Sequence, residues 1–200
     1  MLIAGAVLFA ASLASFAPAR AQQQTADGPR YTAAGELIRP TDFREWSFVT
    51  SGLGMTYNQP TGAARTPNFT NVYVNPSAHR AFAKSGRWPD KTMFILEIRA
   101  SSSEGSINKG GHFQSALVVV EASVKDEGRY AALPGSWAYF DFGREMKTAT
   151  QPLPASERCY ACHAENAAVD NTFVQFYPTL FEVAKTFNTL RPSFANAVHH

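Results

Sequence analysis

The chain has 200 residues, of which 45% are hydrophobic and 17% are charged, a composition typical of one globular domain with a sizeable core. Its 18 basic and 16 acidic side chains nearly balance, and no basic run or cluster is present. This charge pattern argues against nucleic acid as a partner.

The first segment of the chain indicates export. Residues 2–19 contain no charged side chain, and small residues stand at Ala19 and Ala21. This pattern predicts a signal peptide over 1–21, cleaved before Gln22. A membrane anchor is the alternative, but a span needs about 20 apolar residues and this stretch is marginal in length. We therefore expect a periplasmic protein.

The middle of the chain reads as a β-rich domain. Residues 22–42 are polar with scattered Gly and Pro, which predicts a flexible N-terminal arm before one domain over 43–200. Pro76 and Gly86 mark the expected start and stop of a short helix. Alternating or β-branched runs predict five strands, over 46–51, 69–74, 92–99, 117–124 and 137–142.

The last 45 residues have helical spacing. The apolar residues that share this spacing are Val169, Phe173, Phe176, Tyr177, Leu180, Phe181 and Ala184. They predict an amphipathic helix that also carries the cysteines, with a kink or a second helix at Pro178. The predicted fold class is α+β, an antiparallel sheet of about five strands with helices on one side.

The chain contains only two cysteines, Cys159 and Cys162, and His163 follows them directly. A disulfide or redox pair, a zinc half-site and a covalent haem anchor are the three interpretations. A redox pair gives no reason for the histidine, and a structural zinc site needs four ligands while the other histidines are scattered at 79, 112, 199 and 200.

The C-x-x-C-H run is the attachment signature of c-type haem. On a helix, Cys159 and Cys162 lie on one face, where their thiols can bond the two vinyl groups of one porphyrin. His163 then becomes the proximal iron ligand. The motif therefore predicts one haem c per chain.

The sequence does not identify a second axial ligand of the iron. Electron-carrying cytochromes commonly use a methionine. Met55, Met93 and Met146 could serve or could be core residues, and no methionine follows His163. We expect five-coordinate iron with an open distal site.

Six segments together carry a resemblance to a known family. In chain order they read FREWSFVTSGLG, FTNVYVNPSAHRAF, SGRWPDKTMFILEIR, VVVEASVKDEGRYA, WAYFDF and CYACHAENAAVDNTFVQFYPTL. Over about residues 40–182 the chain resembles the cytochrome P-460 and cytochrome c′-beta family. The resemblance implies a β-rich homodimer whose single haem is carried by the C-terminal helix, with nitric oxide or hydroxylamine as the small ligand or substrate. Cytochromes c′ that are four-helix bundles share the late C-x-x-C-H, but the strand-like middle of this chain argues against that fold.

The resemblance also assigns roles on the distal side. P-460 enzymes oxidise hydroxylamine and carry a lysine-porphyrin link, and Leu96 stands at that lysine's position. Leucine cannot form the link, and the nearest lysine, Lys91, lies in the turn PDKT and reads as an exposed turn residue. This difference favours ligand binding over the cross-linked chemistry.

Glu121 resembles the family's distal carboxylate, which accepts protons from the substrate and would be the catalytic residue. Alternation places it on one strand face with Leu117, Val119 and Ser123. Apolar surroundings would raise its pKa toward neutrality, which suits proton transfer. A structural salt bridge, or a carboxylate at a strand end in water, is the alternative for Glu121.

Phe69, Phe94 and Leu96 are the candidate residues of the distal pocket, because aromatic side chains cap the open iron face in c′-beta proteins. Core packing is the alternative for either phenylalanine. Three functions follow: an open-site cytochrome for small nitrogen species, an oxidoreductase acting on hydroxylamine or nitric oxide, and an electron-transfer cytochrome with a soluble redox partner.

Overall fold

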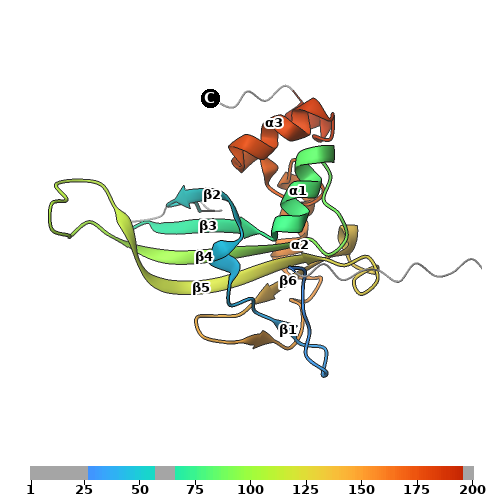
Figure 1. Cartoon of the computed structure of the whole chain (residues 1–200), viewed down its shortest axis with the longest axis horizontal. Coiled ribbons are helices and arrows are strands. Elements are labelled where there is room, and N and C mark those ends of the chain that lie inside the picture. The colour runs from blue at the N-terminus through green and yellow to red at the C-terminus, as the bar shows by residue number, and fades with distance from the viewer. Residues whose placement is uncertain (1–26, 57–65, 196–200) are drawn as a thin grey trace, which may run out of the picture.

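A five-stranded antiparallel sheet is the centre of the computed structural model, which describes residues 27–56 and 66–195. Its strands pair in the order β2-β3-β4-β5-β6, and β4 and β5 extend beyond the others as a long hairpin (Figure 1). Their bounds are β2 Ser47–Leu53, β3 Asn68–Val74, β4 Met93–Ser102, β5 Phe113–Lys125 and β6 Trp137–Asp141. The five predicted strands and the α+β class are confirmed.

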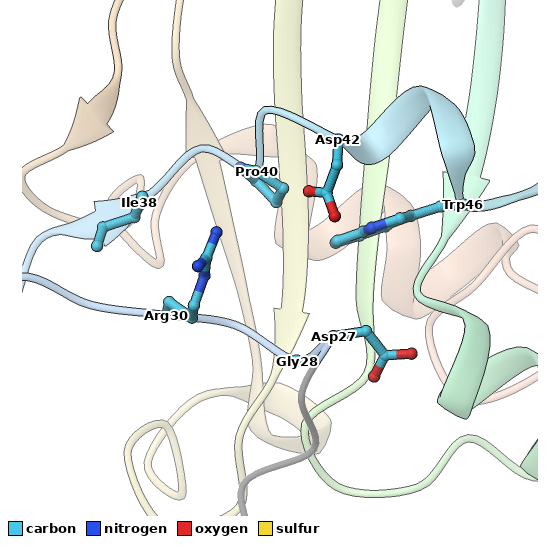
Figure 2. Close-up of a pocket in the computed structure, with 7 residues that line it drawn as sticks. All are labelled: Asp27, Gly28, Arg30, Ile38, Pro40, Asp42 and Trp46. Atoms are coloured by element: carbon cyan, nitrogen blue, oxygen red, sulfur yellow. The ribbon is translucent and has the colours of Figure 1, made fainter.

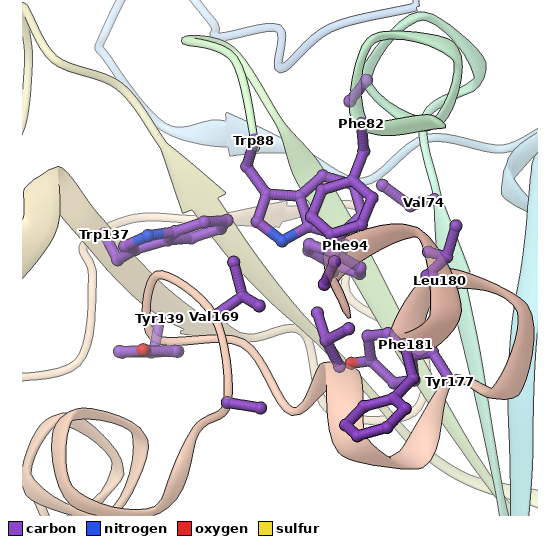
Figure 3. Packing of buried hydrophobic residues seen from close by; sticks show 14 of the residues in the cluster. Val74, Phe82, Trp88, Phe94, Trp137, Tyr139, Val169, Tyr177, Leu180 and Phe181 are labelled. Atoms are coloured by element: carbon purple, nitrogen blue, oxygen red, sulfur yellow. The ribbon is translucent and has the colours of Figure 1, made fainter. Parts of the chain in front are cut away.

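Three helices pack on one face of this sheet, which we call the helix face (Figure 1). They are α1 (Pro76–Ser85), α2 (Arg158–Asn166) and α3 (Pro178–Thr186). Phe82 of α1 and Phe181 of α3 join one buried cluster with side chains of β3, β4 and β6 (Figure 3). Tyr160 of α2 belongs to the same cluster. Helix α1 ends where Gly86 adopts a left-handed φ of 65°, as the sequence predicts. No helix within the described ranges is long and apolar enough to cross a membrane.

The helix that carries the cysteines ends earlier than predicted. Helix α2 ends at Asn166, and a tight turn over 169–172 follows, in which Asp170 and Asn171 have φ values of 42° and 56°. Asp and Asn tolerate this left-handed backbone better than other residues with a side chain. Pro178 does not kink a helix but begins α3, where its missing N–H needs no partner. A continuous helix through Val169 is therefore wrong.

The opposite face of the sheet is covered by the segment that precedes it, and we call it the arm face. Strand β1 (Leu37–Ile38) pairs with β7 (Thr148–Ala149), and Leu37 is fully buried with Phe43 and Trp46. Short 3₁₀ helices lie at Phe43–Glu45, Pro134–Ser136, Val174–Phe176 and Pro192–Phe194.

The predicted flexible arm is packed over 27–42. The Asp27 carboxylate accepts a hydrogen bond of 2.7 Å from the backbone N–H of Ser77, at the first turn of α1. Asp27, Arg30 and Trp46 are among the residues around a hollow of about 70 Å³ (Figure 2). Burial of Leu37 is the reason that this segment is fixed. Residues 22–26 and the predicted leader, 1–21, lie outside the described residues.

Candidate functional site

Helix α2 presents two free thiols, Cys159 and Cys162, and both are partly buried. Residues three apart are neighbours on one face of a helix. Burial raises the pKa of the Cys159 thiol, and the negative charge of Glu121 adds to this effect. Glu121 is therefore near Cys159, although the two are on different elements.

His163, the next residue of α2, is fixed from three sides. Its ring lies between Tyr139 and Phe173, with centroid distances of 4.5 and 4.4 Å. Its Nδ1 lies 2.7 Å from the carbonyl oxygen of Asn171. A carbonyl oxygen can only accept, so Nδ1 carries the proton and the lone pair is left on Nε2. Burial lowers the pKa of His163, which keeps the ring neutral, as a metal ligand must be.

Tyr139 of β6 has a buried hydroxyl group. Its Oη atom makes no hydrogen bond within the described residues. Burial raises the pKa of Tyr139, and both cysteines lie near enough to add to the shift. Such a hydroxyl destabilises a fold by about 1–3 kcal/mol unless another group satisfies it.

The donor set therefore fits a c-type haem. Two thiols on one helix face could hold the porphyrin, His163 Nε2 could bind the iron, and the Tyr139 hydroxyl offers a buried polar contact. Within 27–56 and 66–195, no three His, Cys, Asp or Glu side chains are grouped so as to hold a metal ion. The zinc interpretation thus finds no additional ligands there.

Glu121 lies on the helix face, where it is the Cα partner of Leu96 in β4 and of Asp141 in β6. Val72 pairs with Leu96 in the same row. Burial raises the pKa of Glu121, and the Asp141 carboxylate raises it further. The described part of the chain gives the Glu121 carboxylate no hydrogen bond or ion pair, so the salt-bridge alternative has no support there.

The predicted neighbours of Glu121 are partly wrong. Val119 and Ser123 share its face, but the register of β4 and β5 shifts beyond Ile98. Leu117 therefore pairs with Arg99 and packs against the arm-face cluster. A bulge adds one residue to a strand and reverses the faces beyond it, which strict alternation does not anticipate.

The three candidate pocket residues do not lie together. Successive side chains of a strand point to opposite faces of the sheet. Val72 and Val74 of β3 pack with the helix-face cluster, so Phe69, an odd number of positions from both, lies on the arm face. The placement of Phe69 beside Leu96 is therefore wrong.

Phe94 shares the helix face with Leu96 but is only 4% exposed. Its ring lies 4.8 Å from Trp88 and 6.0 Å from Tyr177, inside the aromatic cluster (Figure 3). Core packing accounts for Phe94, whereas Leu96 on the same face is partly exposed.

Lys91 is in a turn, with a left-handed φ of 63°. Its Nζ atom forms ion pairs with Asp126 and Asp90. The charge of Lys91 is thus already neutralised by one carboxylate of its own turn and by another that follows β5.

Sequence reasoning missed the residues that hold His163, namely Tyr139, Phe173 and Asn171. A signal existed for Asn171, since Asp-Asn between Val169 and Thr172 is a turn pair. The helical spacing of the surrounding apolar residues concealed it. For the two aromatic residues the sequence carries no comparable signal.

Comparison with known proteins agrees with this geometry. The sequence model of the family described as Cytochrome P460 matches residues 40–174, more than half of the chain, including the C-x-x-C-H run. No match was found among the curated proteins. The chain therefore belongs to the cytochrome P460 family, which makes it a haem-binding cytochrome.

Proposed function

We propose that the protein is an exported mono-haem c-type cytochrome with an open distal site for nitric oxide or a related small nitrogen species. In this proposal Cys159 and Cys162 form the thioethers, and Nε2 of His163 is the proximal ligand. The hydrogen bond from Nδ1 to Asn171 supports that role, because it orients the ring and makes the imidazole a stronger ligand. Export to the periplasm rests on the sequence of residues 1–21, and a homodimer rests on the family resemblance.

The observation that best supports an open distal site is the position of the methionines. Met93 is fully buried in the arm-face cluster, across the sheet from α2. Met55 and Met146 have side chains about half exposed, at 52% and 51%. None of the three belongs to the helix-face cluster around α2. This arrangement supports five-coordinate iron rather than an electron carrier with a methionine ligand.

A haem held by Cys159, Cys162 and His163 would supply iron that can bind a small ligand. The chain would surround that ligand with the apolar side chain of Leu96 and with Glu121, which share a row on the helix face. Because burial and Asp141 raise the pKa of Glu121, its carboxyl group can hold or release a proton nearer to neutral pH than an ordinary glutamate.

Hydroxylamine oxidation is the second candidate function, and it is favoured by the raised pKa of the Glu121 carboxyl group and by its place near Cys159. Two observations weigh against the cross-linked form of this chemistry. Leu96 occupies the position that the resemblance assigns to the linking lysine, and Lys91 is engaged by Asp126.

An absorption spectrum of the purified protein tests the proposal. We expect high-spin, five-coordinate spectra in the ferric and ferrous states, and a new band set when nitric oxide is added. Six-coordinate low-spin spectra in both resting states would contradict the open site. Mass spectrometry of tryptic peptides should find haem on the peptide with Cys159 and Cys162 alone.

Hydroxylamine turnover distinguishes the second candidate. Sustained oxidation that is lost in Glu121→Gln and kept in Glu145→Gln, an exposed carboxylate between β6 and β7, would establish the enzyme. We expect no such turnover, because leucine at position 96 cannot form the link.

A further inference from the structure

The acceptor for His163 belongs to an unusual turn. Val169 and Thr172 exchange two backbone hydrogen bonds, of 2.8 and 3.3 Å, so that Asp170 and Asn171 are the two central residues of a tight reversal. Both central residues have positive φ, the conformation of a type I′ turn. The direction of the Asn171 carbonyl, and therefore of the His163 hydrogen bond, depends on this turn.

Side chains from outside α2 hold the turn in place. The Asp170 carboxylate accepts hydrogen bonds from Lys125 Nζ at 2.6 Å and from Trp137 Nε1 at 3.3 Å. The Asn171 side-chain amide donates to the carbonyl oxygen of Pro134 at 3.1 Å. Each central residue is thus fixed by at least one partner.

Lys125 is the charged partner of Asp170 in this turn. It is the last residue of β5, its side chain is only 13% exposed, and it also donates to the Trp88 carbonyl oxygen at 3.3 Å. An ion pair this sheltered is screened less by salt and solvent than a surface pair. Lys125 therefore has the geometry and the charge to fix Asp170.

We propose that Lys125 is a positioning residue for the haem ligand, acting through Asp170 and the Asn171 carbonyl to fix His163. This inference rests on the proposed role of His163 as the proximal ligand. A carbonyl held firmly on Nδ1–H makes the imidazole a stronger donor at Nε2, and a loosened turn makes it a weaker one. A weaker donor favours the reduced state of the iron, so loss of Lys125 raises the midpoint potential.

The sign of this change separates positioning from simple charge. Removing a positive charge near the haem makes reduction less favourable and lowers the midpoint potential. Lys125→Met therefore shifts the potential upward if the hydrogen bond dominates, and downward if only the charge matters. Lys125 and Asp170 also line a hollow of about 300 Å³, so a shorter side chain enlarges an existing space instead of opening a new core cavity.

The experiment compares the haem-loaded wild type with Lys125→Met, Lys125→Arg and Lys147→Met. Lys147 is exposed, so its variant controls for the loss of one surface charge. We expect Lys125→Met to raise the midpoint potential and to lower the iron–histidine stretching frequency of the ferrous protein. We expect Lys125→Arg and Lys147→Met to resemble the wild type in both measurements.

An unchanged stretching frequency in Lys125→Met, with a constant or lower potential, would overturn the inference. If that variant does not fold, Asp170→Asn replaces it, since asparagine tolerates the same backbone and still accepts from Trp137. The stretching frequency is then decisive, because the lost negative charge alone would also raise the potential. Absence of an iron–histidine band in the wild type would refute the proposed function itself, whereas a band that is present but unmoved refutes only the role of Lys125.

Discussion

Two glutamates on neighbouring strands, Glu97 and Glu121, lie on opposite faces of the sheet and have opposite surroundings. Glu97 is on the arm face and is 2% exposed. Its carboxylate accepts hydrogen bonds from Arg44 Nε at 2.9 Å, from Arg99 Nη1 at 3.0 Å and from Asn71 Nδ2 at 3.3 Å. Glu121, on the helix face, has no hydrogen bond or ion pair within the described residues, and the like charge of Asp141 lies beside it.

The consequences for the two pKa values are opposite. Burial by itself raises the pKa of Glu97, but the hydrogen bonds from Arg44, Asn71 and Arg99, together with the positive charge of Arg44, outweigh it and leave the pKa lowered. For Glu121, burial and Asp141 act in the same direction and raise the pKa. A carboxylate with partners stays charged and holds the sheet together, whereas one without partners is available for proton exchange.

The largest effect is expected at Glu97. Glu97→Ala removes the common acceptor of Arg44, Arg99 and Asn71, and we expect it to lower the free energy of unfolding by about 1–3 kcal/mol. Urea unfolding at neutral pH measures this loss. Glu121→Ala is the matched control, and an equal loss there would erase the contrast between the two faces.

Acidification should reveal the same network. Because the folded-state pKa of Glu97 is lowered, its stabilisation is complete above the unfolded value of about 4.3 and is lost as the pH falls through the folded pKa. The wild type should thus lose stability more steeply than Glu97→Gln in this acidic window. Parallel pH profiles for the two proteins would contradict the assignment.

A smaller effect is expected at Tyr139, on the helix face. If haem supplies a partner for its hydroxyl, Tyr139→Phe should destabilise the haem-loaded protein by about 1 kcal/mol, as a lost hydrogen bond does. Tyr160→Phe is the control, since the Tyr160 hydroxyl donates to the Leu153 carbonyl oxygen at 3.1 Å within the protein. A stabilising Tyr139→Phe beside a destabilising Tyr160→Phe would mean that the hydroxyl stays unsatisfied.

The two faces should also differ in ligand binding. Leu96→Ala removes a side chain from the row that contains Glu121, so we expect faster association of carbon monoxide with the ferrous protein. Phe69→Ala changes the arm face, and its association rate should equal that of the wild type. Flash photolysis measures both rates, and a larger change in Phe69→Ala would reverse the assignment of the faces.

The smallest effect is expected at Glu121. Its folded-state pKa is raised, so wild-type stability falls as the pH rises from about 4.3 through the folded pKa. Glutamine does not titrate, so Glu121→Gln should be slightly more stable than the wild type at neutral pH and equal to it below about pH 4. Urea midpoints at the two pH values test this difference, and a less stable Glu121→Gln at neutral pH would indicate a partner for the carboxylate.

Local sequence patterns were sufficient for much of the fold. Alternating apolar and polar residues predicted five strands, because each strand buries one face. Pro76 and Gly86 predicted α1, because proline is favoured at the first position of a helix and glycine just after its end. Prediction failed where distant residues decide the outcome. The bulge that places Leu117 on the opposite face of the sheet and the packing that buries Leu37 both depend on pairing with other strands.

The sequence by itself determined the chemistry of the site. Cys159, Cys162 and His163 are close together in the chain, so their spacing on the helix does not depend on where the helix packs. Tertiary structure decided how that chemistry is arranged. It oriented His163 between two aromatic rings and against the Asn171 carbonyl, and it put Phe69 on the far face of the sheet. The physical reason is that ligand identity is a property of side chains, whereas orientation, burial and pairing depend on contacts between residues far apart in the chain.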